Sequence, residues 1–241
     1  MKLMQLLTKK YNFSQGNAIV GLLFSFAIIE VVAELFSFKV ILFAFRPLIA
    51  LMILYLYWIT SKERSVLFFI TIFFLLLTSI FIILETELFL KLGLVGIVIH
   101  RLLLIIYIIK LNKVKDYIPI LIAIIPFVFI FSYLLSISDG IPEGSYYPLL
   151  VQNILVSILG GVILSNYFMT ETTNTPWLSI FGVLFIALYF TVFIEKLFLN
   201  NLPPTYFRPL GMVLYVTSYY AFYKFVIDTE KLNTNANENN E

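Results

Sequence analysis

Apolar runs of about 20 residues, separated by short polar breaks, follow one another along almost the whole chain. About 20 helical residues cross the hydrocarbon core of a bilayer, and the runs lack the in/out alternation of membrane β-strands. The pattern therefore predicts an all-α, polytopic membrane protein, a bundle of eight transmembrane helices. The predicted helices cover residues 17–36, 39–60, 65–84, 88–111, 117–136, 147–168, 177–199 and 205–227.

Polar segments flank this predicted membrane domain, which we place at residues 17–228. Residues 1–16 form a lysine-containing lead that we expect on the cytoplasmic side. Residues 229–241 are rich in asparagine and acidic residues. Such a segment buries too little apolar area to offset its ordering entropy, so we predict a disordered cytoplasmic tail.

Composition agrees with membrane embedding, because 61% of the residues are hydrophobic and only 12% are charged. A soluble domain needs more charge on its surface. The net charge of +2 gives no reason to expect a nucleic-acid partner. The chain has no cysteine and one histidine, His100, so we expect no metal centre and no other cofactor.

Lysine and arginine are distributed unevenly between the two sets of predicted connections. Ten lie on the side of the N-terminus, and three, Lys39, Lys91 and Lys196, lie on the other side. Basic residues favour the cytoplasmic side of a membrane. We therefore expect a bacterial-type cytoplasmic (inner) membrane protein with both termini in the cytoplasm.

The tetrapeptide Phe-Arg-Pro-Leu occurs twice, with its arginines at Arg46 and Arg208. Glu34 precedes Arg46 by 12 residues and Glu195 precedes Arg208 by 13, each across a short predicted hairpin. Charges inside a membrane segment tend to pair or to serve a function. We predict that Glu30 or Glu34 contacts Arg46 and that Glu195 contacts Arg208, either as structural ion pairs or as functional groups.

The predicted pairs lie in the outer half of the bundle, on the side away from the termini. Other polar residues of the predicted helices fall in or near that half. They are Gln152 and Asn153 in the sixth helix and His100 and Arg101 near the middle of the fourth. These groups predict one polar cavity that opens toward the outer leaflet. The tyrosines between residues 215 and 223 are interpreted as an aromatic belt at the inner interface.

The chain resembles the YhhN family of eight-helix membrane proteins, which includes lysoplasmalogenases. The resemblance extends from the first predicted helix to the eighth. It rests on the Arg-Pro-Leu sequence from Arg46 to Leu48, on His100 in a helix that also contains Gly93 and Gly96, and on Tyr215. It implies hydrolysis of the vinyl ether bond of a lysoplasmalogen, which gives an aldehyde and a glycerophospho-headgroup.

The family carries aspartates in its third and seventh helices, whereas the three aspartates of this chain, Asp116, Asp139 and Asp228, lie in predicted loops or the tail. Vinyl ether hydrolysis needs a general acid and a base for water. In this chain the candidates are Glu30, Glu34 and Glu195. The candidates for binding the substrate, a lysophospholipid-like membrane lipid, are Arg46, His100, Arg101, Gln152, Asn153 and Arg208.

A second interpretation remains open. The chain is then a non-enzymatic, degenerate relative that binds lipid or carries a small solute through the same cavity.

Overall fold

The computed structural model describes residues 2–36, 38–84, 86–112, 117–138, 141, 146–169, 175–199 and 207–238. These residues form eight α-helices and no strand, and every helix is long and apolar enough to cross a membrane. The predicted fold class, an eight-helix bundle, is confirmed. The helices are α1 (Lys2–Leu35), α2 (Lys39–Thr60), α3 (Val66–Ile83), α4 (Glu87–Asn112), α5 (Ile118–Ser136), α6 (Tyr146–Met169), α7 (Trp177–Phe198) and α8 (Phe207–Glu238).

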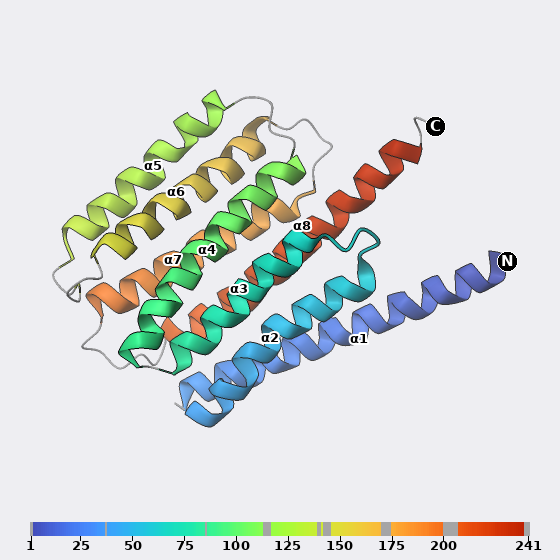
Figure 1. The fold of residues 1–241 in the computed structure, drawn as a ribbon, viewed down its shortest axis with the longest axis horizontal. Coiled ribbons are helices and arrows are strands. Elements are labelled where there is room, and N and C mark those ends of the chain that lie inside the picture. Colours follow the sequence, from blue (N-terminus) through green and yellow to red (C-terminus); the bar gives the residue numbers. More distant parts are fainter. Residues whose placement is uncertain are drawn as a thin grey trace.

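Consecutive helices run in opposite directions (Figure 1). We call the end of the bundle where α1 leads to α2 and α7 leads to α8 the hairpin end; it lies at the lower left of Figure 1. The opposite end, which we call the termini end, holds the start of α1 and the end of α8 (Figure 1). The four hairpins α1–α2, α3–α4, α5–α6 and α7–α8 are each packed together, and α8 also packs against α1 and α2. Because α2 also packs against α3, the first two helices are joined to the rest of the bundle by both α8 and α3.

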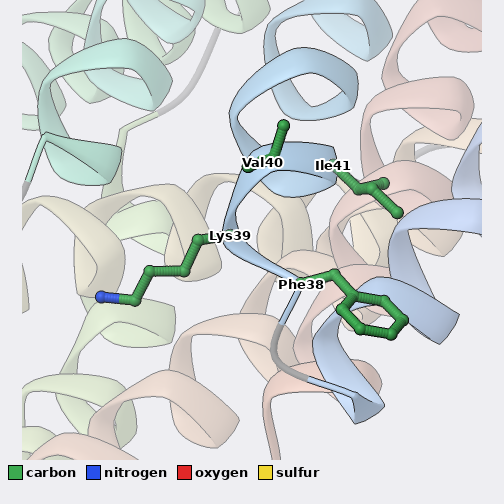
Figure 2. Close-up of a pocket in the computed structure, with 4 residues that line it drawn as sticks. All are labelled: Phe38, Lys39, Val40 and Ile41. Atoms are coloured by element: carbon green, nitrogen blue, oxygen red, sulfur yellow. The ribbon is translucent and has the colours of Figure 1, made fainter.

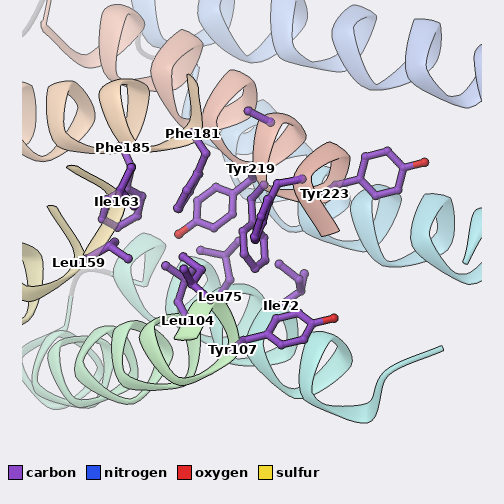
Figure 3. Close-up of a cluster of buried hydrophobic side chains, with 14 of the residues drawn as sticks. Ile72, Leu75, Leu104, Tyr107, Leu159, Ile163, Phe181, Phe185, Tyr219 and Tyr223 are labelled. Atoms are coloured by element: carbon purple, nitrogen blue, oxygen red, sulfur yellow. The ribbon is translucent and has the colours of Figure 1, made fainter. Parts of the chain in front are cut away.

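The centre of the bundle is filled by large aromatic and aliphatic side chains (Figure 3). Phe222 of α8 stacks on Phe68 of α3 with 5.8 Å between ring centroids, and Phe68 stacks on Tyr57 of α2 at 3.8 Å. All three rings are fully buried. Stacked and edge-to-face aromatic pairs add to the energy of area burial, so this cluster ties three helices together.

A glycine permits the close contact of α5 and α6. A Cβ atom on Gly161 would lie 2.4 Å from Cγ1 of Ile124 and 2.9 Å from its backbone nitrogen. A larger residue would therefore push against the backbone of α5. Small residues at such crossings allow membrane helices to approach closely.

Two helices extend beyond the predicted membrane domain. The backbone of α1 is helical from Lys2, within the predicted lead, and that of α8 is helical to Glu238, through most of the segment for which we predicted disorder. The physical reason in α8 is Glu230, whose side chain is buried and accepts hydrogen bonds from α2 and from the α2–α3 connection. Residues 239–241 lie outside the described part of the chain.

Candidate functional site

Arg46 of α2 binds two carboxylates of α1 near the hairpin end. Glu30 and Glu34 lie one turn apart on the same face of α1. The Arg46 Nε donates to Oε1 of Glu30 at 2.9 Å, and its Nη2 donates to Oε1 of Glu34. The same Nη2 lies 3.4 Å from the Sδ of Met212 in α8. The predicted contact is confirmed, and both glutamates make it.

The charges in this cluster do not balance by simple pairing, because one guanidinium faces two carboxylates. The Glu30 side chain is 0% exposed, whereas that of Arg46 is 20% exposed. The Oε2 atom of Glu30 is buried and has no hydrogen-bond partner among the described residues. A buried carboxylate oxygen without a donor is destabilising unless a proton or another ligand reaches it.

The second predicted pair also forms. Nε of Arg208 donates to Oε1 of Glu195 at 3.0 Å, which links α8 to α7 at the hairpin end. The Arg208 side chain is 43% exposed, so this pair is more exposed than the Arg46 cluster. The two copies of the tetrapeptide therefore hold similar pairs in different environments.

His100 of α4 is buried and uses both ring nitrogens. Its Nδ1 lies 2.8 Å from the backbone oxygen of Thr71 in α3, and its Nε2 lies 2.7 Å from the hydroxyl of Tyr219 in α8. These contacts join three helices. They do not bring His100 to Arg101, Gln152 or Asn153, with which the sequence grouped it.

Arg101 points to the other side of α4 and meets α6 and α7. Its Nη1 donates to Oε1 of Gln152 at 3.2 Å, and its guanidinium lies 4.5 Å from the centre of the Tyr189 ring. The Tyr189 hydroxyl donates to Oδ1 of Asn153, whose Nδ2 donates to the backbone oxygen of Phe131 in α5 at 3.2 Å. The three predicted residues Arg101, Gln152 and Asn153 thus form one buried network, and Tyr189 is a member that the sequence interpretation missed.

The tyrosines of α8 do not form an interfacial belt, so that interpretation was wrong. Tyr219 and Tyr223 are buried between helices. Tyr223 donates to Oγ1 of Thr60 at 2.9 Å, and the hydroxyl of Tyr215 lies 3.4 Å from the Oγ of Ser79. These hydroxyl groups serve as contacts between α8 and its neighbours α2 and α3.

A polar cluster at the termini end was not predicted. Glu230 of α8 accepts hydrogen bonds from the Tyr57 hydroxyl at 2.5 Å and from the Ser61 hydroxyl at 2.7 Å, while the Tyr57 oxygen accepts from the backbone N–H of Ser65 at 2.8 Å. The spacing of the buried positions of α8 could have revealed it. Positions 212, 219, 222, 226 and 230 repeat at three, four or seven residues and continue the inward face beyond the predicted end of the membrane domain.

The polar groups that we assigned to one cavity are divided among these separate clusters. Two hollows in the surface lie elsewhere. One, of about 320 Å³, is lined by Leu54, Phe69, Ile70 and Phe73 of α2 and α3. The other, of about 380 Å³, lies at the start of α2 and is lined by Phe38, Lys39, Val40 and Ile41, with the Lys39 side chain directed away from Phe38 and Ile41 (Figure 2).

Within the described residues, no three histidine, aspartate or glutamate side chains come together as metal ligands. Comparison with models of known protein families, with curated proteins and with solved structures gave no match. The resemblance to the YhhN family therefore stays a prediction.

Proposed function

We propose that this multi-pass membrane protein binds a lysophospholipid-like amphiphile at the hairpin end and hydrolyses its vinyl ether bond, as the resemblance to the YhhN family implies. The observation that carries the proposal is the carboxyl group of Glu30. One of its oxygens is held by Arg46, and the other is buried without a partner among the described residues. A carboxyl group in this position can hold a proton away from water, as a general acid must.

The proposed reaction assigns roles to Glu30, Arg46 and Arg208. The Glu30 carboxyl donates its proton to the vinyl ether carbon remote from oxygen, and Arg46 stabilises the carboxylate that forms. Water adds to the resulting oxocarbenium ion, and the carboxylate takes a proton from that water. The hemiacetal then collapses to an aldehyde and the free glycerophospho-headgroup. Arg208, which is partly exposed at the same end, is suited to bind a headgroup phosphate.

The test is turnover of a lysoplasmalogen by the purified full-length protein. We expect release of an aldehyde from the vinyl ether lysolipid and none from the saturated ether with the same headgroup. Glu30→Gln keeps the shape of the side chain and removes the acid, so aldehyde release should fall at least about a hundredfold. Lys91→Ala, at an exposed pair with Glu87, is the matched control and should leave turnover unchanged. A folded and fully active Glu30→Gln protein would exclude Glu30 as the acid.

The second candidate is a non-enzymatic protein that binds lipid or carries a small solute. The full burial of Glu30 favours it, because a substrate reaches that carboxyl only if neighbouring side chains move. A wild-type protein that binds the lysolipid but releases no aldehyde would support this alternative.

We also propose that both termini lie in the cytoplasm and that the membrane is a bacterial-type cytoplasmic membrane, on the basis of the lysine and arginine distribution.

A further inference from the structure

Arg101 is a buried cation for which the described residues supply no anion. Its side chain lies in the interior of the bundle and the residue is 8% exposed. The ion pairs within the described residues involve Arg46, Lys91, Arg208 and Lys231, and none involves Arg101. An unpaired charge inside a membrane bundle is strongly unfavourable, and such residues are usually paired or functional.

The contacts that Arg101 makes with described residues do not neutralise its charge. Gln152 contributes one amide oxygen at 3.2 Å, and Tyr189 contributes the face of its ring at 4.5 Å. A cation–π contact lowers the energy of a guanidinium without neutralising it. The guanidinium carries five N–H donors, and the contacts with Gln152 and Tyr189 cannot use all of them.

Gln152 provides a second, independent observation. Its oxygen faces Arg101, and its Nε2 is buried without a hydrogen-bond acceptor among the described residues. A buried amide N–H without an acceptor is destabilising. Unused donors of a guanidinium and of an amide thus occur together, and both require an acceptor. A negatively charged acceptor would, in addition, neutralise the charge of Arg101.

We propose that Arg101 and Gln152 form a binding site for an oxyanion, a phosphate or carboxylate group, between α4, α6 and α7. Gln152 is six residues from the start of α6, so the site lies about 9 Å along the helix from the hairpin end. The planar fork of arginine matches the two oxygens of such a group. Arg46 and Arg208 already have carboxylate partners, whereas Arg101 has none among the described residues, which makes it the better anion receptor. The site does not depend on the proposed hydrolysis.

The bound group can belong to a free anion or to the headgroup of a lipid, and two probes distinguish these sources. The full-length protein, purified in an uncharged detergent, is titrated with inorganic phosphate against potassium chloride at equal ionic strength. A second titration uses lysophosphatidic acid against a monoacylglycerol with the same chain. A ligand that binds the folded state raises its midpoint of thermal unfolding. We expect a saturable rise with at least one phosphate-bearing probe, and the effective probe identifies the source.

Two substitutions test the site itself. Arg101→Gln removes the charge and should raise the apparent Kd about tenfold or more. Gln152→Glu places a carboxylate beside Arg101, so the unliganded protein should unfold at a higher temperature than the wild type and should lose the phosphate-dependent shift. Lys91→Gln is the control and should keep the shift with inorganic phosphate, because Lys91 lies at an exposed pair with Glu87, outside this site.

Three results would overturn the proposal: no saturable shift in the wild type with either probe, an unchanged Kd in Arg101→Gln, or an undiminished shift in Gln152→Glu. Should Arg101→Gln not fold, the Gln152→Glu protein decides the matter. Because the readout is unfolding temperature rather than aldehyde release, failure of the anion site and failure of the proposed hydrolysis are observed separately.

Discussion

Arg46 and Arg208 follow phenylalanine and precede proline and leucine in the same tetrapeptide, yet their surroundings differ. Arg46 holds two carboxylates that are almost completely buried, and its own side chain is 20% exposed. Arg208 holds one carboxylate and is 43% exposed. The energy of an ion pair depends on how far its members are removed from polar surroundings, so the two pairs should contribute differently to stability.

The substitutions Arg46→Met and Arg208→Met measure this difference. Removing Arg46 leaves Glu30 and Glu34 facing one another without a cation, which should destabilise the fold by about 3–5 kcal/mol. Removing the more exposed Arg208 should have a smaller effect, of about 1 kcal/mol or less. The measurement is the unfolding midpoint of each protein in the same detergent. Equal losses for the two variants would show that burial does not set the strength of these pairs.

Spacing along the chain was sufficient to predict both arginine pairs. A hairpin with a short connection brings residues that lie equally far from the turn to the same depth, so Glu34 meets Arg46 and Glu195 meets Arg208. No such rule applies to partners on helices that are distant in sequence. The contacts of His100 with Tyr219 and of Arg101 with Tyr189 depend on which faces of α4, α7 and α8 meet.

At the scale of single elements, α8 is one of the two helices that extend well beyond their predicted bounds. Its polar C-terminal residues indicated disorder, but Glu230 continues the buried face that begins near the hairpin end. A prediction from composition averages over a whole segment, so it does not detect a single residue that faces inward. The two hydroxyl donors that hold Glu230 come from Tyr57 and from Ser61, near the end of α2.

Tyr57→Phe tests whether this cluster holds the end of α8. The substitution removes a donor to Glu230 and the acceptor for the backbone N–H of Ser65, and it keeps the stacked ring. Leaving those buried groups unpaired should destabilise the protein by about 1–3 kcal/mol and increase hydrogen exchange over 226–234. Tyr55→Phe, at an exposed tyrosine two residues away, should change neither. An unchanged exchange rate in Tyr57→Phe would show that α8 does not need this hydrogen bond.

At the scale of the whole molecule, the sequence predicted the number of helices and the contacts across the first and last hairpins. Apolar runs, polar breaks and short connections are local features of the chain. The sequence did not predict that α8 packs against α1 and α2, or that α4 packs against α6. Those contacts follow from complementary side-chain shapes, such as the stacking of Phe222 on Phe68. For the same reason the polar residues predicted to share one cavity lie in several clusters, each set by a different helix contact.

The alternation of helices in Figure 1 places the end of α5 and the start of α6 at the hairpin end and the end of α8 at the opposite end. A membrane that encloses the eight helices therefore separates these two sites. The side of the termini carries ten lysine and arginine residues and the other side carries three, which favours a cytoplasmic location for the side of the termini.

Reporter fusions that are active only in the cytoplasm should be active after residue 241 and inactive within residues 138–146. A fusion within residues 170–174, between the end of α6 and the start of α7, is the control and should behave like the C-terminal one. Equal activity at residue 241 and within 138–146 would contradict the eight-span topology, and a uniform reversal would contradict only the orientation.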